Sequence, residues 1–153
     1  MTHDHRRLGV EFNNRSWELI EKGAARTPEE DRELLAAAHS SFAHWSKAGT
    51  AVNRYRAEIL IARTHAELGH AQAASLHLHA AERLAKECDK DLTPFDTAFG
   101  EAVAARVHAL AQNPAEAELH HARTEQLAEA LDDDDRRVVL ADLRSGPWYG
   151  FKP

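Results

Sequence analysis

Histidine is the residue type whose number and placement first suggest chemistry in this chain. The 153 residues include 11 histidines, two pairs of which lie close together as His77-x-His79 and His120-His121. Neutral imidazole is the commonest metal ligand among protein side chains. Two ligands on one helix usually lie three or four residues apart, and neither pair has that spacing. A metal site would therefore have to be assembled between helices.

The candidate ligands for such a site are histidines and glutamates of the repeated region, four of which occupy matching points in its two halves. They are His65, His108, His121, Glu58 and Glu101. The alternative interpretation is that the three histidines are partly buried packing residues that hydrogen-bond across a helical hairpin. No cofactor is predicted.

Other chemistries find little support. Cys88 is the single cysteine, which excludes an internal disulfide and a paired-cysteine metal site. There is no phosphate-binding glycine loop and no Gly-x-Ser-x-Gly nucleophile motif. The acidic run at 132–135 fits the start of a helix, where carboxylates complement the helix dipole. The sequence therefore favours a binding role over an enzymatic one.

The elements that would position these residues repeat at a spacing of 43 residues. Ten residues between 62 and 85 are identical to the residue 43 positions later. The matches include Ala62-Arg63 with Ala105-Arg106, His65-Ala66 with His108-Ala109, and Leu76-His77 with Leu119-His120. A fixed period of this size indicates stacked supersecondary units.

Helix signals dominate the chain and strand signals are absent. Ala, Leu, Glu and Arg fill long stretches without the alternation of a half-buried strand. Thr27-Pro28, Thr93-Pro94 and Asn113-Pro114 each offer an N-cap followed by a proline at the first helical position. The sequence predicts about seven helices, at 6–22, 28–47, 51–68, 71–88, 94–111, 114–130 and 134–143. Because the loops between them are short, successive helices should pack as antiparallel hairpins.

Within each repeat the spacing resembles the tetratricopeptide (TPR) family, in a variant with long helices, over about residues 51–130. Ala62 and Ala105 are the small residues that the family has in its first helix, and Ala74 and Ala117 those of its second helix. Gly69 matches the glycine of the turn. The chain departs from the family pattern at several positions, which include His65 and His108 in place of tyrosine, Glu58 and Glu101 in place of a bulky apolar residue, and Gln112 in place of the second turn glycine.

The resemblance implies an all-α fold, a right-handed stack of antiparallel helical hairpins in one domain over 1–153. Its parts would be a degenerate first hairpin at 6–47, repeated hairpins at 51–88 and 94–130, and a C-terminal helix with an aromatic tail at 134–153. Trp148, Tyr149 and Phe151 in that tail carry much apolar surface. We expect the tail to cap its own chain, with insertion into a partner chain as the alternative.

The resemblance also implies a concave groove lined by the first helix of each hairpin. Arg56, Arg63 and Arg106 would lie on that side. Arg63 and Arg106 are repeat equivalents, so stacking should place them one helix spacing apart, about 8–10 Å. Two guanidiniums at that distance can clamp a carboxylate or an acidic peptide. The alternative is that each arginine pairs with a glutamate of its own scaffold.

The charge and hydropathy of the chain argue against two classes of partner, nucleic acids and membranes. The net charge of −6 argues against a general nucleic-acid binder, and no apolar run approaches the length of a membrane span. The first residues lack the apolar segment of a secretory signal, and with the lone cysteine this leads us to expect a cytoplasmic protein. The predicted function is a non-enzymatic scaffold that binds a protein or peptide, for which an acidic peptide and a second copy of the chain are both candidates. The alternative is a small metal or ligand site lined by histidine and glutamate, with an enzymatic role left open.

Overall fold

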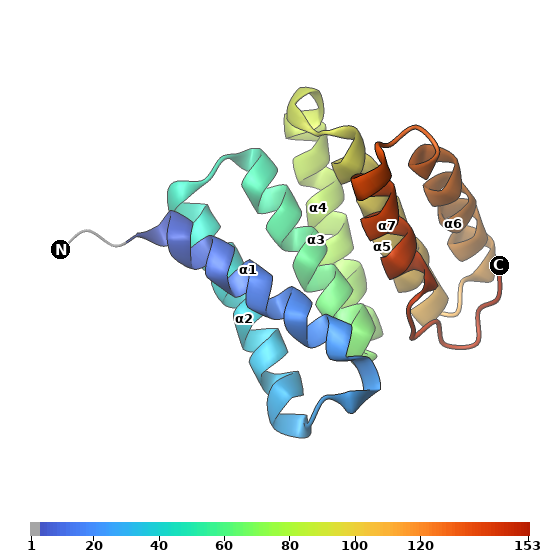
Figure 1. Ribbon diagram of the computed structural model, residues 1–153, viewed down its shortest axis with the longest axis horizontal. Helices are drawn as coiled ribbons and strands as arrows, with labels where there is room; N and C mark the ends of the chain where they lie inside the picture. Colours follow the sequence, from blue (N-terminus) through green and yellow to red (C-terminus); the bar gives the residue numbers. More distant parts are fainter. Residues whose placement is uncertain (1–3) are drawn as a thin grey trace.

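The computed structural model describes residues 4–153, and across them the chain is all-helical (Figure 1). The α-helices are α1 (His5–Lys22), α2 (Pro28–Ala48), α3 (Ala51–Leu68), α4 (Ala71–Cys88), α5 (Pro94–Leu110), α6 (Pro114–Ala128) and α7 (Asp133–Arg144). Two short 3-10 turns, Gly23–Ala25 and Asp89–Asp91, follow α1 and α4. The predicted all-α class is confirmed for the described residues, and each predicted helix end lies within two residues of the observed one.

Local capping explains where several helices begin. The Thr27 hydroxyl accepts a hydrogen bond from the Glu30 backbone N–H at 3.1 Å, and the Glu30 carboxylate accepts one from the Thr27 N–H at 3.0 Å. Thr93 and Asp96 form the same reciprocal box at the start of α5. Asn113 is the N-cap residue of α6, but its side chain makes no capping hydrogen bond, contrary to expectation. Each cap that does form contributes about 1 kcal/mol of helix stability.

The two repeated hairpins turn through the same backbone conformation although only one has a glycine there. Gly69 has φ +81° and its repeat equivalent Gln112 has φ +61°. This left-handed region costs a non-glycine residue about 1 kcal/mol. The Gln112 amide donates hydrogen bonds to the carbonyls of Ala109 (3.3 Å) and Tyr149 (3.4 Å), which offset that cost.

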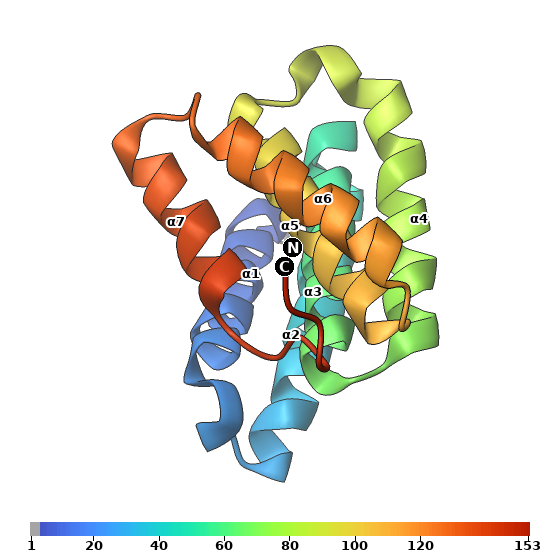
Figure 2. The same cartoon turned by 90° about the vertical axis from the view of Figure 1, so that its right-hand side faces the viewer.

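The hairpins α1–α2, α3–α4 and α5–α6 follow one another along the molecule, and α7 packs on α5 and α6 (Figure 1). The helices α2, α4 and α6 begin at residues 28, 71 and 114, so the 43-residue period extends into the first hairpin. Contacts run in order through α1, α3, α5 and α7. An end-on view places α4 and α7 on opposite sides (Figure 2). The odd-numbered helices therefore form one layer, and each even-numbered helix packs on the odd-numbered helix of its own hairpin.

Small buried residues let the paired helices approach closely. Ala62 on α3 and Ala74 on α4 are both fully buried, as are their equivalents Ala105 on α5 and Ala117 on α6. The central helix α3 is buried on nearly every side, with twelve buried residues. None of the described helices combines the length and hydropathy that crossing a bilayer would require.

The aromatic tail folds back onto its own chain, as expected. The Tyr149 hydroxyl donates a hydrogen bond to the carbonyl of Ala66 at the end of α3. The Trp148 ring packs edge-on against His121 on α6, with centroids 5.7 Å apart, and Phe151 lies 6.1 Å from the same imidazole. The tail thus contacts helices from two different hairpins.

Candidate functional site

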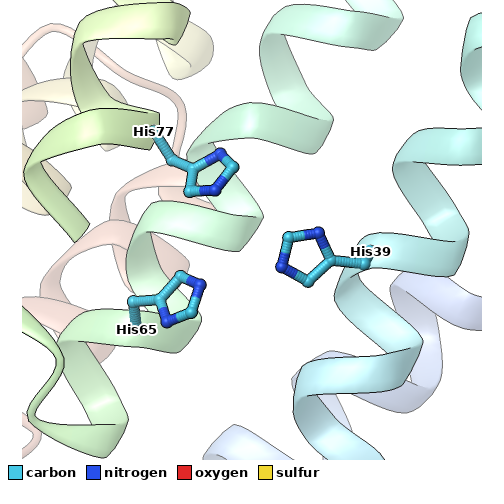
Figure 3. A group of neighbouring side chains, drawn as sticks. All are labelled: His39, His65 and His77. Carbon is cyan, nitrogen blue, oxygen red and sulfur yellow. The ribbon is translucent and has the colours of Figure 1, made fainter. Parts of the chain in front are cut away.

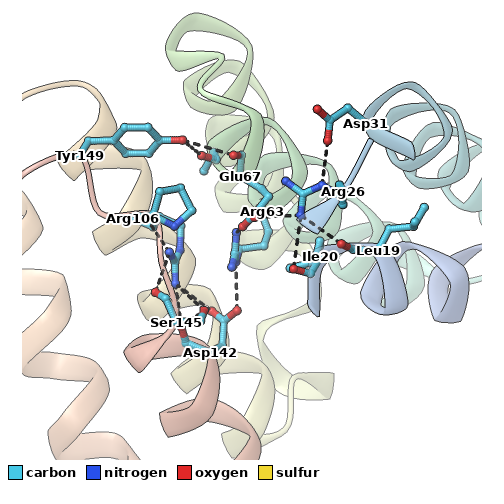
Figure 4. Close-up of polar contacts among 12 residues, drawn as sticks. Leu19, Ile20, Arg26, Asp31, Arg63, Glu67, Arg106, Asp142, Ser145 and Tyr149 are labelled. Atoms are coloured by element: carbon cyan, nitrogen blue, oxygen red, sulfur yellow. Dashed lines mark hydrogen bonds and ion pairs between the residues drawn. The ribbon is translucent and has the colours of Figure 1, made fainter. Parts of the chain in front are cut away.

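Arg63 and Arg106, the expected groove arginines, are fully buried, each with 0% of its surface exposed. The expectation that they would be accessible to an acidic partner is wrong. On α3, Arg63 donates from Nη1 to Glu67 at 2.8 Å and from Nε to Asp142 on α7 at 3.0 Å (Figure 4). The cause is the position of α7, which packs over the first helices and supplies the carboxylate that an external ligand would otherwise supply.

Arg106 is engaged by the C-terminal end of α7 and by the tail. Its guanidinium donates to the carbonyls of Asp142 (2.7 Å), Ser145 (3.1 Å) and Pro147 (2.7 Å), and it lies 4.3 Å from the centre of a Trp148 ring. Burial and the nearby charge of Arg63 lower the pKa of Arg106 to about 10, which leaves it protonated at pH 7. Both arginines therefore stabilise the packing of α7 against the first helices, and Arg106 also binds the tail.

The network continues into the first hairpin. Glu67, whose side chain is 4% exposed, also accepts a hydrogen bond from Arg26 Nη1 at 2.9 Å (Figure 4). Arg26 lies in the turn between α1 and α2, where it also donates to the carbonyl of Leu19 (3.0 Å) and to Asp31 (2.8 Å). One carboxylate of α3 thus joins the first hairpin to the layer formed by α3, α5 and α7.

Arg56 is the one groove candidate of the three that remains exposed, with 47% of its side chain accessible. It forms a bidentate pair with Asp96, with Nε and Nη2 each 2.8 Å from a carboxylate oxygen. Burial alone would raise the pKa of Asp96, but these bonds and the Thr93 backbone N–H hold it below its ordinary value. Arg56 therefore pairs within the scaffold at the edge of a cavity.

That cavity has a volume of about 1220 Å³ and is bordered by α1, α3, α5 and α7 with their adjoining turns. None of its lining residues belongs to α2, α4 or α6. Its apolar side chains come from all four helices and include Trp17, Ile59, Phe99 and Val138. Val138 is 52% exposed. The cavity thus combines apolar side chains from four helices with charged ones, among them Arg56, Arg137 and Asp142.

Histidines gather on the other side of α3, where three helices meet. One ring nitrogen each from His39 (α2), His65 (α3) and His77 (α4) lie within 4.8 Å of one another. Figure 3 shows the three rings turned toward one common space. The rings of His65 and His77 stack at 5.6 Å, and that of His39 lies edge-on to both, at 5.8 and 5.5 Å.

Two of these rings are fixed by hydrogen bonds on the nitrogen nearer the backbone. His77 Nδ1 lies 2.6 Å from Glu58 Oε2, and His65 Nδ1 lies 3.0 Å from His70 Nδ1. Burial, with the neighbouring imidazoles, lowers the pKa of His65 to about 4. Burial and His77 also lower the pKa of His39. His65 is therefore neutral at pH 7, the form in which imidazole binds a metal.

The second repeat carries a related cluster. His120 Nδ1 lies 2.5 Å from Glu101 Oε2, and the rings of His108 and His120 stack at 5.2 Å. These are the repeat equivalents of Glu58, His65 and His77. The third potential ligand is Glu116, which like His120 lies on α6.

No protein-family model, curated protein or solved structure matches this chain. What the sites can do must therefore be inferred from their own residues.

The structure brings together some of the predicted metal candidates and separates others. His65 and His108 each belong to a cluster, while Glu58 and Glu101 contact the outer nitrogen of an imidazole instead of completing the ligand set. His121 belongs to neither cluster, because its ring packs against the aromatic tail.

The candidate ligands named from the sequence did not include His39, His77, Glu116 or His120. Spacing within a helix shows that neither histidine pair can hold an ion alone, but it does not show which side chains of different helices converge. The sequence did contain a signal: Glu58 precedes His77 by the same interval as Glu101 precedes His120, so each repeat pairs a glutamate of its first helix with a histidine of its second.

Proposed function

We propose that this chain is a TPR-like interaction module whose first helices receive an amphipathic helix of a partner protein. In this proposal the hairpins form a right-handed stack, and the scaffold is non-enzymatic. The observation that supports it is the cavity of about 1220 Å³, which is bordered by α1, α3, α5 and α7 and by their turns. A large concave apolar surface with a few polar groups at its edge is the usual form of a binding site.

The lining of the cavity favours a helical occupant over an extended one. An extended peptide leaves its backbone N–H and C=O groups to be satisfied by the receptor. No strand edge is present in residues 4–153, and Arg63 and Arg106 are committed to internal partners. A helix satisfies its own backbone and presents apolar side chains at i, i+3, i+4 and i+7. Trp17, Ile59 and Val138 offer the matching apolar surface.

The test is a display library of helical peptides, selected against the purified chain. The enriched peptides should carry the i, i+3, i+4, i+7 apolar pattern. In fluorescence anisotropy they should bind the Val138→Glu/Ala141→Glu variant at least about tenfold more weakly, because each glutamate would place a charge against the apolar side of the ligand. Both positions are exposed, so the variant should fold.

The matched control is Leu76→Glu, which places the same charge on an exposed leucine of α4, outside the cavity. It should bind as the unaltered chain does. A proline in the middle of a selected peptide should abolish binding by breaking its helix. The proposal fails if the selected peptides show no helical pattern, or if the Val138→Glu/Ala141→Glu variant binds them as tightly as the control does.

A further inference from the structure

We propose that His39, His65 and His77 form a binding site for a Zn²⁺ ion. The three imidazoles come from α2, α3 and α4 and face one space at the junction of the first two hairpins (Figure 3). This site is separate from the proposed peptide cavity, whose lining includes none of these histidines.

The distances require only a small closure. Zinc binds imidazole nitrogen at about 2.0–2.1 Å with tetrahedral geometry, which places ligand nitrogens about 3.3 Å apart. The three candidate nitrogens lie within 4.8 Å of one another. His39 is exposed, whereas His65 is buried and the His77 side chain is only 21% exposed. The exposed His39 side chain is therefore the ligand most free to turn toward the ion, and the closure that the three nitrogens need is at most about 1.5 Å per pair.

The hydrogen bonds that His65 and His77 make through Nδ1 determine which ring nitrogens are left to bind the ion. Glu58 holds Nδ1 of His77 and His70 holds Nδ1 of His65, which leaves Nε2 of each ring for a metal. A carboxylate on the outer nitrogen of a ligating histidine fixes its tautomer and raises its basicity. Glu58, with its side chain 10% exposed, is in this respect a positioning residue.

The chemistry of the donors selects the class of ion. Three imidazoles with no oxygen ligand do not suit Mg²⁺ or Ca²⁺, which take carboxylates, carbonyls and water. They suit a borderline ion such as Zn²⁺, and three histidines leave a fourth tetrahedral position for water or an external ligand. Since His39 belongs to the first hairpin and the other two ligands to the second, the ion would cross-link the two hairpins.

The experiment is a calorimetric titration of the full chain, prepared without an affinity tag and stripped of metal with a chelator, with ZnCl₂. One equivalent should bind tightly. His39→Ala removes a ligand from an exposed position and should weaken that binding by about 100-fold or more, while Glu58→Gln should weaken it by about 10–100-fold. At free zinc of about 100 times the dissociation constant, the melting temperature should rise by about 5–10 °C.

Two histidines provide controls. His79 is exposed on α4 two residues from His77, and His120 belongs to the second cluster. His79→Ala and His120→Ala should both keep the tight equivalent and the rise in melting temperature. The assignment is overturned if the unaltered chain binds no zinc tightly, if His39→Ala binds as tightly as the unaltered chain, or if His120→Ala is the variant that loses the tight equivalent.

Discussion

Replacing Glu67 by glutamine should show how much of the fold's stability depends on the buried ionic network. The Glu67 carboxylate accepts hydrogen bonds from Arg63 at 2.8 Å and from Arg26 at 2.9 Å, and the three side chains are between 1% and 7% exposed. The substitution preserves the shape of the side chain and removes its charge. It leaves two buried guanidiniums to share one neutral oxygen.

The expected loss is about 3 kcal/mol of the free energy of unfolding. Removing one partner of a buried ion pair costs about 3–5 kcal/mol, and the retained amide oxygen keeps part of one hydrogen bond. A protein of this size has about 5–15 kcal/mol in total. With a denaturant slope of about 2 kcal/mol per M, the urea midpoint should fall by about 1.5 M. Circular dichroism and tryptophan fluorescence should report the same transition.

The matched control is Glu33→Gln, which removes a carboxylate that Arg15 contacts at 2.7 and 3.0 Å on the surface. Both of those side chains are more than 40% exposed, so solvent and salt screen the pair and the urea midpoint should not change measurably. Equal midpoints for Glu67→Gln and Glu33→Gln would refute the reasoning.

Adding Arg63→Met to Glu67→Gln removes a buried charge of each sign and restores the balance. The double variant should therefore be more stable than the sum of the two single losses predicts, by about 0.5–3 kcal/mol. Strict additivity would show that the two side chains do not act as a pair.

Two further variants test close packing and the tail. Gly100→Ala would place a Cβ well inside van der Waals contact with the Tyr55 hydroxyl oxygen, so it should lower stability by about 1–3 kcal/mol in urea denaturation despite the better helix propensity of alanine. Adding Tyr55→Phe, which removes the contacting oxygen, should recover part of that loss, and an undiminished stability of Gly100→Ala would contradict the close approach of α3 and α5. Deleting residues 146–153 removes the Tyr149 hydrogen bond to Ala66 and the Trp148 contact with Arg106, so the chain should lose about 2 kcal/mol or more and keep its oligomeric state in light scattering. An unchanged melting temperature, or a changed oligomer, would show that the tail does not cap its own chain.

Helix positions could be predicted from the sequence because their signals are local. The cap at Thr27, the proline at 28 and the glycine at 69 each act within one turn of the helix that they bound. The short loops likewise indicate which helices pair, and the 43-residue repeat indicates that two of the hairpins share the same local packing.

The alternative that each arginine pairs with a glutamate of its own scaffold holds for Arg63, which contacts Glu67, but the burial of Arg63 and Arg106 could not be predicted in the same way. Whether Arg63 and Arg106 face solvent depends on where α7 lies, and α7 is outside the repeated region 51–130. Asp142 comes within 3.0 Å of Arg63 across 79 residues of chain. No periodicity reports such a contact.

The two histidine clusters differ because of one repeat position. Since α2 and α4 begin 43 residues apart, the residue of α4 that corresponds to His39 is Glu82. Glu82 is near enough to act on His108 electrostatically, yet it is not among the three groups that converge there. The preceding hairpin therefore supplies an imidazole to the first cluster and none to the second.

This difference bears on what an ion would do at each place. In the second cluster the third group is Glu116, which shares α6 with His120, and His108 lies on the paired helix α5. An ion there would connect two helices that one short turn already joins. The loop that it closes is short, so the ion would reduce the conformational entropy of the unfolded chain only a little. In the first cluster, His39 is 26 residues from His65 in sequence and belongs to a different hairpin. An ion bound there closes a longer loop and cross-links two hairpins, so the first cluster is where metal binding would contribute more to the stability of the stack.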